Sequence, residues 1–289
     1  MKYRLLAFVL TSLAVGAAAA DAPPAPRIEP ITPRVSVIVA GFNGAITVFK
    51  SDRGPVIVDT ADAASAAQVQ ALIRAFDPRP PAAVILTHYH DDHSGGLATL
   101  AAGAPLYVQQ NCLASYRQRT KGAEDALAKA ARLVPYDGDT EIKLGADVVR
   151  LVHPAHAHTS GDTVVVIERE KVIAAGDLFF NGLPPYIDVA DGASTAVWAD
   201  TIDRLATQYA GFRVVPGHGP LADTEGWRQF GVYLRALRQG VAEAVKAGQT
   251  REQAQASVRL EQFSSIKDVG DFLTKKANVG WVYDELTKK

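Results

Sequence analysis

Residues 87–93 read Thr-His-Tyr-His-Asp-Asp-His, and they directly follow a short, wholly apolar run at 82–86. Imidazole suits zinc, and a carboxylate beside it suits a second divalent ion. If the apolar run is a strand and the chain turns sharply after it, His88 and His90 can point at one position while Asp92 and His93 point at another. We therefore interpret this stretch as a metal site, not as a polar loop of solvated histidines.

Three further residues follow runs that we expect to be strands. His158 opens His-Thr-Ser-Gly-Asp, Asp177 lies in Ala-Ala-Gly-Asp-Leu-Phe-Phe, and His218 lies in Pro-Gly-His-Gly-Pro. A single carboxylate after a strand is most often a cap or turn residue. Together with the 88–93 cluster, however, these residues provide five histidines and two aspartates, which is enough for two metal ions.

The rest of the chain alternates between strand and helix patterns. We expect strands at 35–40, 45–50, 55–59, 82–86, 106–108, 140–144, 147–153, 163–168, 171–175 and 213–215, the first three of them antiparallel. We expect helices at 61–76, at 109–133 with a break near Gly122, at 194–208 and over most of the chain after 221. This order predicts an α/β layered domain with two sheets, each covered by helices. Ligand sites in open α/β sheets lie at strand ends, where the histidines fall.

The first 20 residues have the pattern of a secretory signal peptide. Lys2 and Arg4 precede an apolar run of about 11 residues and then small residues up to Ala20. That run is short for a membrane anchor, which needs roughly 20 residues. We expect cleavage after Ala20, a proline-rich extended leader at 21–33, a single domain at 34–289 with a helical C-terminal part, and export to the bacterial periplasm.

Composition excludes several classes of protein. Without the signal peptide the chain has 28 basic and 31 acidic residues, so a basic nucleic-acid binder is excluded, and no later segment is apolar enough to predict membrane attachment. Cys112 is the only cysteine, so no intramolecular disulfide can form. Met1 is the only methionine, which makes soft-ligand copper or iron–sulfur chemistry implausible. We expect a small-molecule substrate, and the oligomeric state stays open.

The motif order H-x-H-x-D-H, A-H-T-x-G-D, G-D-L-F and G-H-G resembles the metallo-β-lactamase fold superfamily over about residues 35–221. The resemblance implies a four-layer αβ/βα sandwich, with two mixed sheets flanked by helices. It also implies a dinuclear site in which Asp177 bridges the two metals and Asp59 orients the histidine loop. The implied ligands are His88, His90 and His158 for the first metal, and Asp92, His93 and His218 for the second.

The resemblance implies a hydrolase that uses metal-activated water. Bound metal lowers the pKa of water to about 7, so hydroxide is available at neutral pH. Asp92 would hold this nucleophile and take its proton, which makes it the candidate catalytic residue. We expect two Zn²⁺ ions per chain, although two aspartates also suit Mn²⁺ or Fe²⁺.

The match departs from the classical β-lactamases at two positions. Asp177 stands where those enzymes have a cysteine, and Phe180 stands where they have a lysine for the antibiotic's carboxylate. Asp177 and the pair Phe179 and Phe180 are similar to glyoxalase II and lactonases, which favours an ester, thioester, lactone or amide substrate. A β-lactamase is the alternative. A mononuclear iron sulfur dioxygenase and a non-catalytic binding module are further alternatives, whereas His90 argues against a flavodiiron protein.

Several residues have no place in the motifs. Cys112 comes before His158 in the chain and lies in an expected helix, so it does not match the position of the cysteine ligand. We expect it to be buried and to pack as a small apolar residue. The roles of His153 and His156 stay open, with a pocket position conceivable for His156. Five aromatic residues could line an apolar substrate wall, with core packing the favoured alternative for each: Phe42, Phe179, Phe180, Tyr186 and Trp198.

Overall fold

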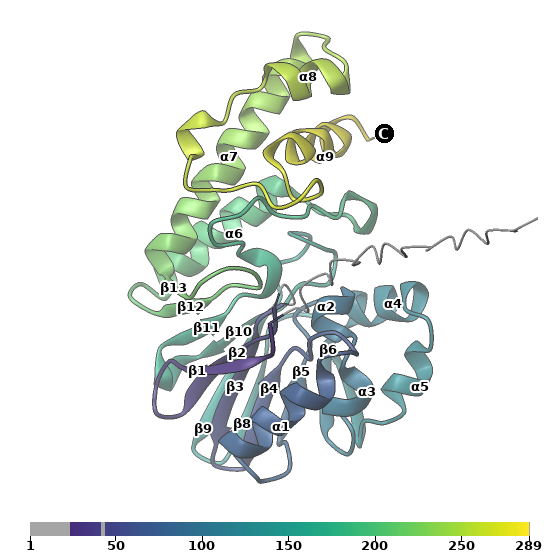
Figure 1. The fold of residues 1–289 in the computed structure, drawn as a ribbon, viewed down its shortest axis with the longest axis vertical. Coiled ribbons are helices and arrows are strands. Elements are labelled where there is room, and N and C mark those ends of the chain that lie inside the picture. The colour runs from purple at the N-terminus through teal and green to yellow at the C-terminus, as the bar shows by residue number, and fades with distance from the viewer. Residues whose placement is uncertain (1–23, 42–43, 289) are drawn as a thin grey trace, which may run out of the picture.

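A computed structural model describes residues 24–41 and 44–288 of the chain. The expected signal peptide and Phe42 lie outside these residues. Two mixed β-sheets pack face to face, and helices cover the outer face of each (Figure 1). This arrangement confirms the predicted four-layer αβ/βα sandwich.

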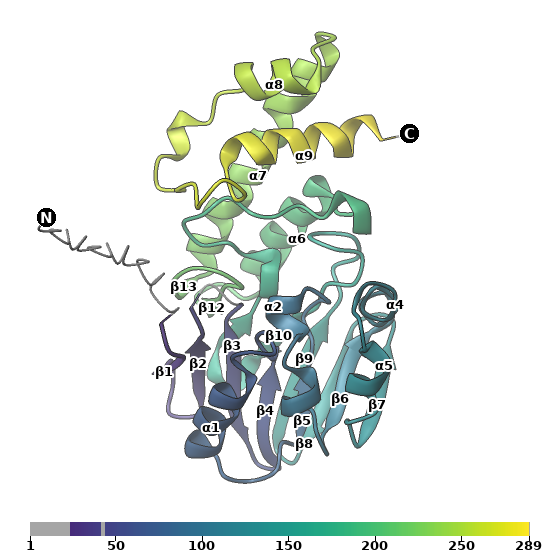
Figure 2. The ribbon, with the colours of Figure 1, turned by 45° about the vertical axis from the view of Figure 1, so that its right-hand side comes forward.

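The first sheet has seven strands that lie in chain order, antiparallel from β1 to β4 and parallel from β4 to β7. Five helices follow its strands, and α1, α3 and α5 lie over its outer face (Figure 2). The strands are β1 (Arg27–Pro30), β2 (Val35–Val39), β3 (Ile46–Ser51), β4 (Gly54–Val58), β5 (Ala83–Ile85), β6 (Pro105–Gln109) and β7 (Arg132–Tyr136). The helices are α1 (Ala66–Phe76), α2 (Asp91–Ser94), α3 (Leu97–Leu100), α4 (Gln110–Arg119) and α5 (Ala123–Leu127).

The second sheet has six strands in the order β13-β12-β11-β10-β9-β8. Its strands are β8 (Thr140–Leu144), β9 (Asp147–Val152), β10 (Val164–Ile167), β11 (Val172–Ala174), β12 (Arg213–Val215) and β13 (Ala222–Asp223). Four helices follow or interrupt them: α6 (Thr195–Gln208), α7 (Thr224–Lys246), α8 (Arg251–Ser257) and α9 (Lys275–Thr287). Short 3-10 turns lie at Glu168–Glu170, Gly176–Leu178, Val189–Asp191 and Glu261–Phe263.

Alternating side chains build the layers. In β10, Val165 and Ile167 point between the two sheets, whereas Val164 and Val166 point toward the helices of the second sheet. Both faces of the central strands are buried, so these strands are continuous apolar runs in the sequence. The sheets are thus held by one apolar layer between them and one under each set of helices.

Three elements differ from the sequence-based expectations. Residues 27–30, which were expected in the extended leader, form β1 and pair with β2, so four antiparallel strands open the sheet. The predicted helix at 109–133 breaks near Gly122 as expected, but it ends at Leu127, and the chain continues into β7, which pairs parallel with β6. Pro135 is tolerated there because β7 is an edge strand. Helix α1 begins at Ala66, not at 61, because Asp59 and Ala61 have left-handed φ values of 66° and 56°.

Helix α7 starts against α6 and the second sheet, and its far end, α8 and α9 lie beyond one end of the sandwich (Figures 1 and 2). Buried Asn278 of α9 joins three segments, because its side chain accepts from Tyr233 Oη of α7 at 2.7 Å and donates to the Pro185 carbonyl at 2.6 Å. The C-terminal part is therefore fastened to the loop that precedes α6. Among the described residues, every helix is too short or too polar to cross a bilayer.

Arg34 and Asp147 fasten the two sheets together. Arg34 Nη1 donates to Asp147 Oδ1 at 3.0 Å, and the Asp52 amide donates to Asp147 Oδ2 at 2.9 Å. Burial alone would raise the pKa of Asp147, but these hydrogen bonds hold it below its ordinary value. The ionised carboxylate therefore stabilises the fold at neutral pH.

We predict that Asp147→Asn lowers the free energy of unfolding by about 2 kcal/mol at pH 7, because Arg34 loses its nearest charged partner inside a partly buried contact. A group with a depressed folded pKa stabilises above its unfolded pKa and loses this effect as the pH falls. The difference between the two proteins should therefore shrink below about pH 4 in urea denaturation curves. The control is Asp200→Asn, which removes an exposed ion pair with Arg235. Equal losses in both variants would contradict the prediction.

Candidate metal centre

The structure brings the seven predicted ligand residues together at one end of the sandwich. His88, His90, Asp92 and His93 follow β5, and the last two lie in the first turn of α2. His158 lies in the loop between β9 and β10, Asp177 lies in the 3-10 turn after β11, and His218 follows β12. The parallel strands β11 and β12 end at the same edge, which brings their following turns close to each other.

Four side chains form the first group of ligand atoms. His90 Nδ1 lies 3.0 Å from His88 Nε2 and 3.1 Å from His158 Nε2. Asp177 Oδ2 lies 3.7 Å from His88 Nε2 and 3.4 Å from His158 Nε2. Four ligands held about 2.1 Å from one zinc ion are about 3.4 Å apart, so these four atoms have the spacing of a tetrahedral site.

The second group contains the remaining ligands and the other oxygen of Asp177. Asp177 Oδ1 lies 3.0 Å from His93 Nε2 and 3.4 Å from His218 Nε2. Asp92 Oδ2 lies 3.1 Å from His218 Nε2 and 3.6 Å from His93 Nε2. One carboxylate therefore faces both groups, with a separate oxygen for each.

Two atoms of the cluster test whether a cation fits. His93 Nε2 and Asp177 Oδ1 are both buried, and neither makes a well-formed hydrogen bond to any part of the chain that the structure describes. A buried polar atom without a partner is costly, and a metal ion between an imidazole nitrogen and a carboxylate oxygen removes that cost for both. The donor set of nitrogen and oxygen atoms suits a divalent ion of the zinc, manganese or iron type.

Asp59 orients the histidine loop, as the sequence resemblance implied. Its Oδ2 lies 2.8 Å from His93 Nδ1, and its two oxygens accept from the amide and the hydroxyl of Thr87 at 2.7 Å each. The Thr87 hydroxyl in turn lies 3.0 Å from His88 Nδ1. One buried carboxylate thus positions a histidine of each group.

Two orienting contacts were not found from the sequence. Asp188 Oδ2 lies 3.1 Å from His90 Nε2 and accepts from Tyr89 Oη, and the Tyr186 carbonyl lies 3.0 Å from His158 Nδ1. Both partners belong to a loop about 100 residues after the His88–His93 cluster, so no local motif joins them to it. The signal for Asp188 in the sequence was its position as a carboxylate in a loop shortly after the Asp177 motif.

The electrostatics differ between the two groups. Burial lowers the pKa of His88, and it lowers the pKa of His158 to about 3. Burial acts in the same direction on His93 and His218, but nearby carboxylates, above all Asp177, outweigh it. They raise the pKa of His218 to about 9 and that of His93 well above its ordinary value. The field at the second group therefore favours positive charge, as a cation site requires.

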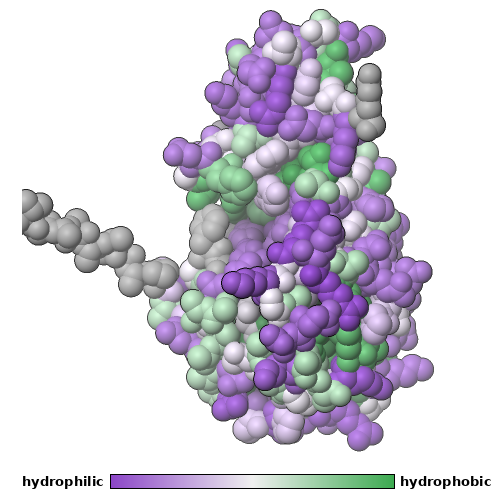
Figure 3. Space-filling model, turned by 90° about the vertical axis from the view of Figure 1, so that its right-hand side faces the viewer, coloured by the Kyte–Doolittle hydropathy of each residue, from purple (hydrophilic) through white to green (hydrophobic). Residues whose placement is uncertain are grey.

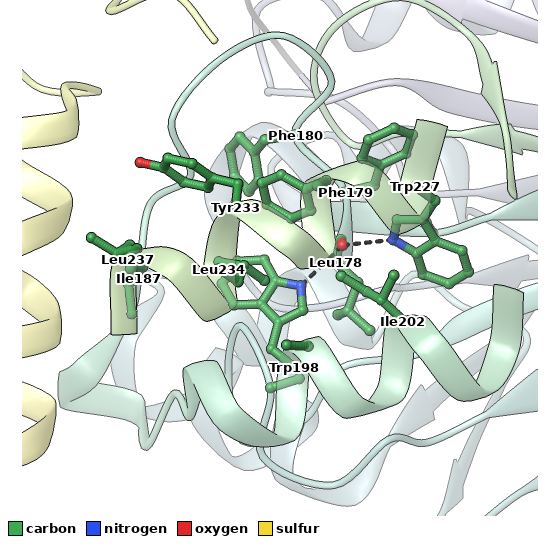
Figure 4. Packing of buried hydrophobic residues seen from close by; sticks show 14 of the residues in the cluster. Leu178, Phe179, Phe180, Ile187, Trp198, Ile202, Trp227, Tyr233, Leu234 and Leu237 are labelled. Atoms are coloured by element: carbon green, nitrogen blue, oxygen red, sulfur yellow. Dashed lines mark hydrogen bonds between the residues drawn. The ribbon is translucent and has the colours of Figure 1, made fainter. Parts of the chain in front are cut away.

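The turn that carries Asp177 is held by two tryptophans. The indole N–H groups of Trp198 on α6 and Trp227 on α7 both donate to the Leu178 carbonyl at 2.9 Å (Figure 4). Trp198, Phe179 and Phe180 are buried in the core, so they pack and do not form an exposed wall. Phe180 also stacks on the His218 ring, with 5.0 Å between centroids.

The residues without a motif lie around the centre. Cys112 is buried, and its backbone packs against Gly161, so it is not among the ligand atoms. His153 Nδ1 lies 2.8 Å from the Asp162 carbonyl, and His156 is exposed.

Beside His218 lies a cavity of about 460 Å³, lined mainly by apolar side chains such as Val37, Val39 and Leu183.

The fold and the cluster together define a two-sheet α/β protein with a His/Asp metal-binding centre. Residues 39–218 match the family model of the metallo-beta-lactamase superfamily, and the chain belongs to this superfamily. That range contains every residue of both ligand groups. The family and the centre point to a metal-dependent hydrolase.

Individual curated relatives match part of the chain at low sequence identity. A metallo-beta-lactamase type 2 of Bacillus cereus is 25% identical over 179 residues, which cover 61% of this chain and 67% of the relative. The alpha subunit of a 2,4-dinitroanisole O-demethylase of Nocardioides sp. (strain JS1661) is 28% identical over 198 residues, 68% of this chain and 58% of the relative. The chain thus spans about half to two thirds of the length of the first curated relatives it matches.

Solved structures show the same fold. The metallo-beta-lactamase of Pontibacter korlensis has a TM-score of 0.63 at 21% identity, over 73% of this chain and 99% of that one. The inverting sec-alkylsulfatase Pisa1 of Pseudomonas sp. has a TM-score of 0.72 at 16% identity, over 91% of this chain and 50% of that one. At these identities the likeness concerns the fold alone.

We predict that Gly217→Ala disrupts the turn that carries Asp177. A Cβ at this position would lie 2.0 Å from Asp177 Oδ1 and 2.8 Å from the Gly176 carbonyl carbon. The expected result is a loss of at least about 2 kcal/mol in the free energy of unfolding, measured with urea, because backbone has to move. Gly138→Ala, with open space around the new methyl group, is the control and should change little. If Gly217→Ala is as stable as the control, the turn can shift to make room for the methyl group, which contradicts the prediction.

Proposed function

We propose that this chain is a zinc-dependent hydrolase with two metal ions per chain. The observation that carries the proposal is the Asp177 carboxylate, whose Oδ2 faces His88 and His158 while its Oδ1 faces His93 and His218. A single carboxylate shared in this way suits two cations side by side. His90 completes the first ligand set, and Asp92 completes the second.

Residues around the ligands orient them and shield them from water. When bound, the metal ions supply hydroxide at neutral pH and polarise the bond to be cleaved. Asp59 orients His93 and Asp188 orients His90, and the burial of His88, His93 and His158 keeps bulk water away from their ring nitrogens. The protein thereby provides a rigid set of ligands that needs no rearrangement before reaction.

We assign Asp92 the role of catalytic proton acceptor. Its side chain is 34% exposed, whereas those of the other members of its group are 9% exposed or less. Asp92 is therefore the ligand of that group that faces both solvent and an incoming substrate. A carboxylate at this position can hold the nucleophile and take its proton.

The proposed substrate is a small ester, thioester, lactone or amide. Phe180 supports this choice over a β-lactam, because it is buried against His218 and offers no charge to an antibiotic's carboxylate. The alternative of β-lactam hydrolysis has its support in the lactamases among the relatives. A single-iron sulfur dioxygenase is disfavoured, because two groups of ligand atoms are present.

The setting of the enzyme belongs to the same proposal. The signal-peptide pattern supports export to the bacterial periplasm, and the acidic charge balance argues against nucleic acid as a partner. We propose that the cleaved chain acts on small molecules away from the membrane.

Metal analysis with a substrate panel tests the proposed function. Purified protein should contain two zinc ions per chain, and chelation should abolish hydrolysis that added zinc then restores. The panel contains a simple ester, a lactone, a glutathione thioester, a penicillin and a carbapenem. Turnover of the first three alone supports the proposal, and turnover of the β-lactams supports the alternative. One iron atom per chain without hydrolysis would overturn both.

Asp188→Asn tests the contact that orients His90. We expect metal affinity at the first group to fall roughly 10- to 100-fold, because the variant loses the negative charge next to the imidazole N–H. The measurement is a titration with zinc against a competing chelator. Tyr89→Phe is the matched control, since it removes one hydrogen bond to Asp188 but leaves the carboxylate. A smaller loss in Asp188→Asn than in Tyr89→Phe would contradict the prediction.

A further inference from the structure

A chain of aromatic rings runs outward from the metal centre. The Tyr186 ring lies 5.4 Å from the His90 ring, measured between centroids. Beyond it, Phe272 lies 5.4 Å and Trp281 lies 5.1 Å from Tyr186, and these two rings are 5.3 Å apart. We call Tyr186, Phe272 and Trp281 the aromatic wall.

The outer end of this wall is open to solvent. Phe272 is 59% exposed, more than any other large apolar side chain in the described part of the molecule, and Tyr186 and Trp281 are partly buried. Single exposed apolar residues are common, but Phe272 is continuous with two rings that lead to a ligand histidine. Figure 3 shows hydrophobic patches on the C-terminal helical part, next to a hollow lined by hydrophilic residues.

The wall is held in place from several sides. Leu273, next to Phe272, is buried, and its carbonyl accepts from the Val269 amide at 2.8 Å. Trp281 lies on α9, where Asn278 donates to the Pro185 carbonyl beside Tyr186. These contacts hold the backbone beside each ring before any ligand binds, which lowers the cost of ordering the wall.

Two members of the wall lie outside the superfamily match. The family model ends at residue 218, and Phe272 and Trp281 come from the helical part that follows it. The ligand groups lie within the matched range, whereas two of the three rings of the wall lie after it.

We propose that the aromatic wall binds the apolar acyl group of the substrate and makes the enzyme select acyl chains several carbons long. The inference rests on the proposed hydrolase function, because only then does a substrate's reacting bond lie at the ligand cluster. An acyl chain that leaves the cluster on the His90 side meets Tyr186 first and Phe272 and Trp281 next. Flat aromatic surfaces bind such chains through buried apolar area.

The kinetic test compares p-nitrophenyl acetate with p-nitrophenyl octanoate on zinc-loaded protein. The octanoate ester should have the higher kcat/KM, and Phe272→Ala should lower that value roughly tenfold while leaving the acetate ester within twofold. Phe272 is exposed, so its truncation should leave the fold intact. Val148→Ala, which trims an exposed apolar residue on β9, is the control and should change neither substrate.

A binding test separates this inference from the proposed function. Titration with octanoate and acetate, followed by tryptophan fluorescence, reports on Trp281, because Trp198 and Trp227 are buried. Octanoate should bind roughly tenfold more tightly than acetate, and Phe272→Ala should remove that difference. Equal affinities for the two acids overturn the proposed role of the aromatic wall, even if the protein hydrolyses esters. Preferred octanoate binding without any hydrolysis supports the wall and overturns the hydrolase.

Discussion

The Asp177 carboxylate has to face two groups of imidazoles from one buried position, and the site depends on that constraint. Its oxygens lie 3.0 to 3.7 Å from four histidine nitrogens, which come from three different loops. Small displacements of the turn would favour one group over the other. Gly217 allows the next loop to pass against Asp177 Oδ1, where a side chain would not fit. Close packing at this turn is therefore a condition for a shared ligand.

Helix α6 and helix α7, which follows the family match, contribute to the same constraint. The Leu178 carbonyl, one residue after Asp177, accepts hydrogen bonds from Trp198 on α6 and Trp227 on α7. Both indoles are fully buried, so their positions follow from the packing of the whole helical layer on the second sheet. Because buried hydrogen bonds in a dense core resist displacement, this layer transmits its rigidity to the ligand turn.

The sequence identified the residues that the structure brings together in two groups, because their signal is local. His88, His90, Asp92 and His93 lie within six positions, and each remaining ligand follows a recognisable strand. Asp188 was missed because it meets His90 only through the tertiary fold. The strands β1 and β7 were missed for another reason: prolines at both made one resemble a leader and the other a helix end, yet each is an edge strand, where a missing N–H is tolerated. Local composition cannot reveal a position in a sheet.

The loop between Leu183 and Asp188 lies between the metal-binding cluster and the proposed aromatic wall. The Tyr186 carbonyl holds His158 while its ring lies against His90, and Asp188 holds the other side of His90. Asn278 on α9 anchors the same loop through Pro185. The C-terminal part thus reaches the ligands through Pro185 and through the Tyr186 ring, against which the rings of Phe272 and Trp281 lie. Under the proposed function, a substitution at Phe272 changes the apolar surface offered to a substrate, while the contacts that orient His90 and His158 come from Asp188 and the Tyr186 carbonyl.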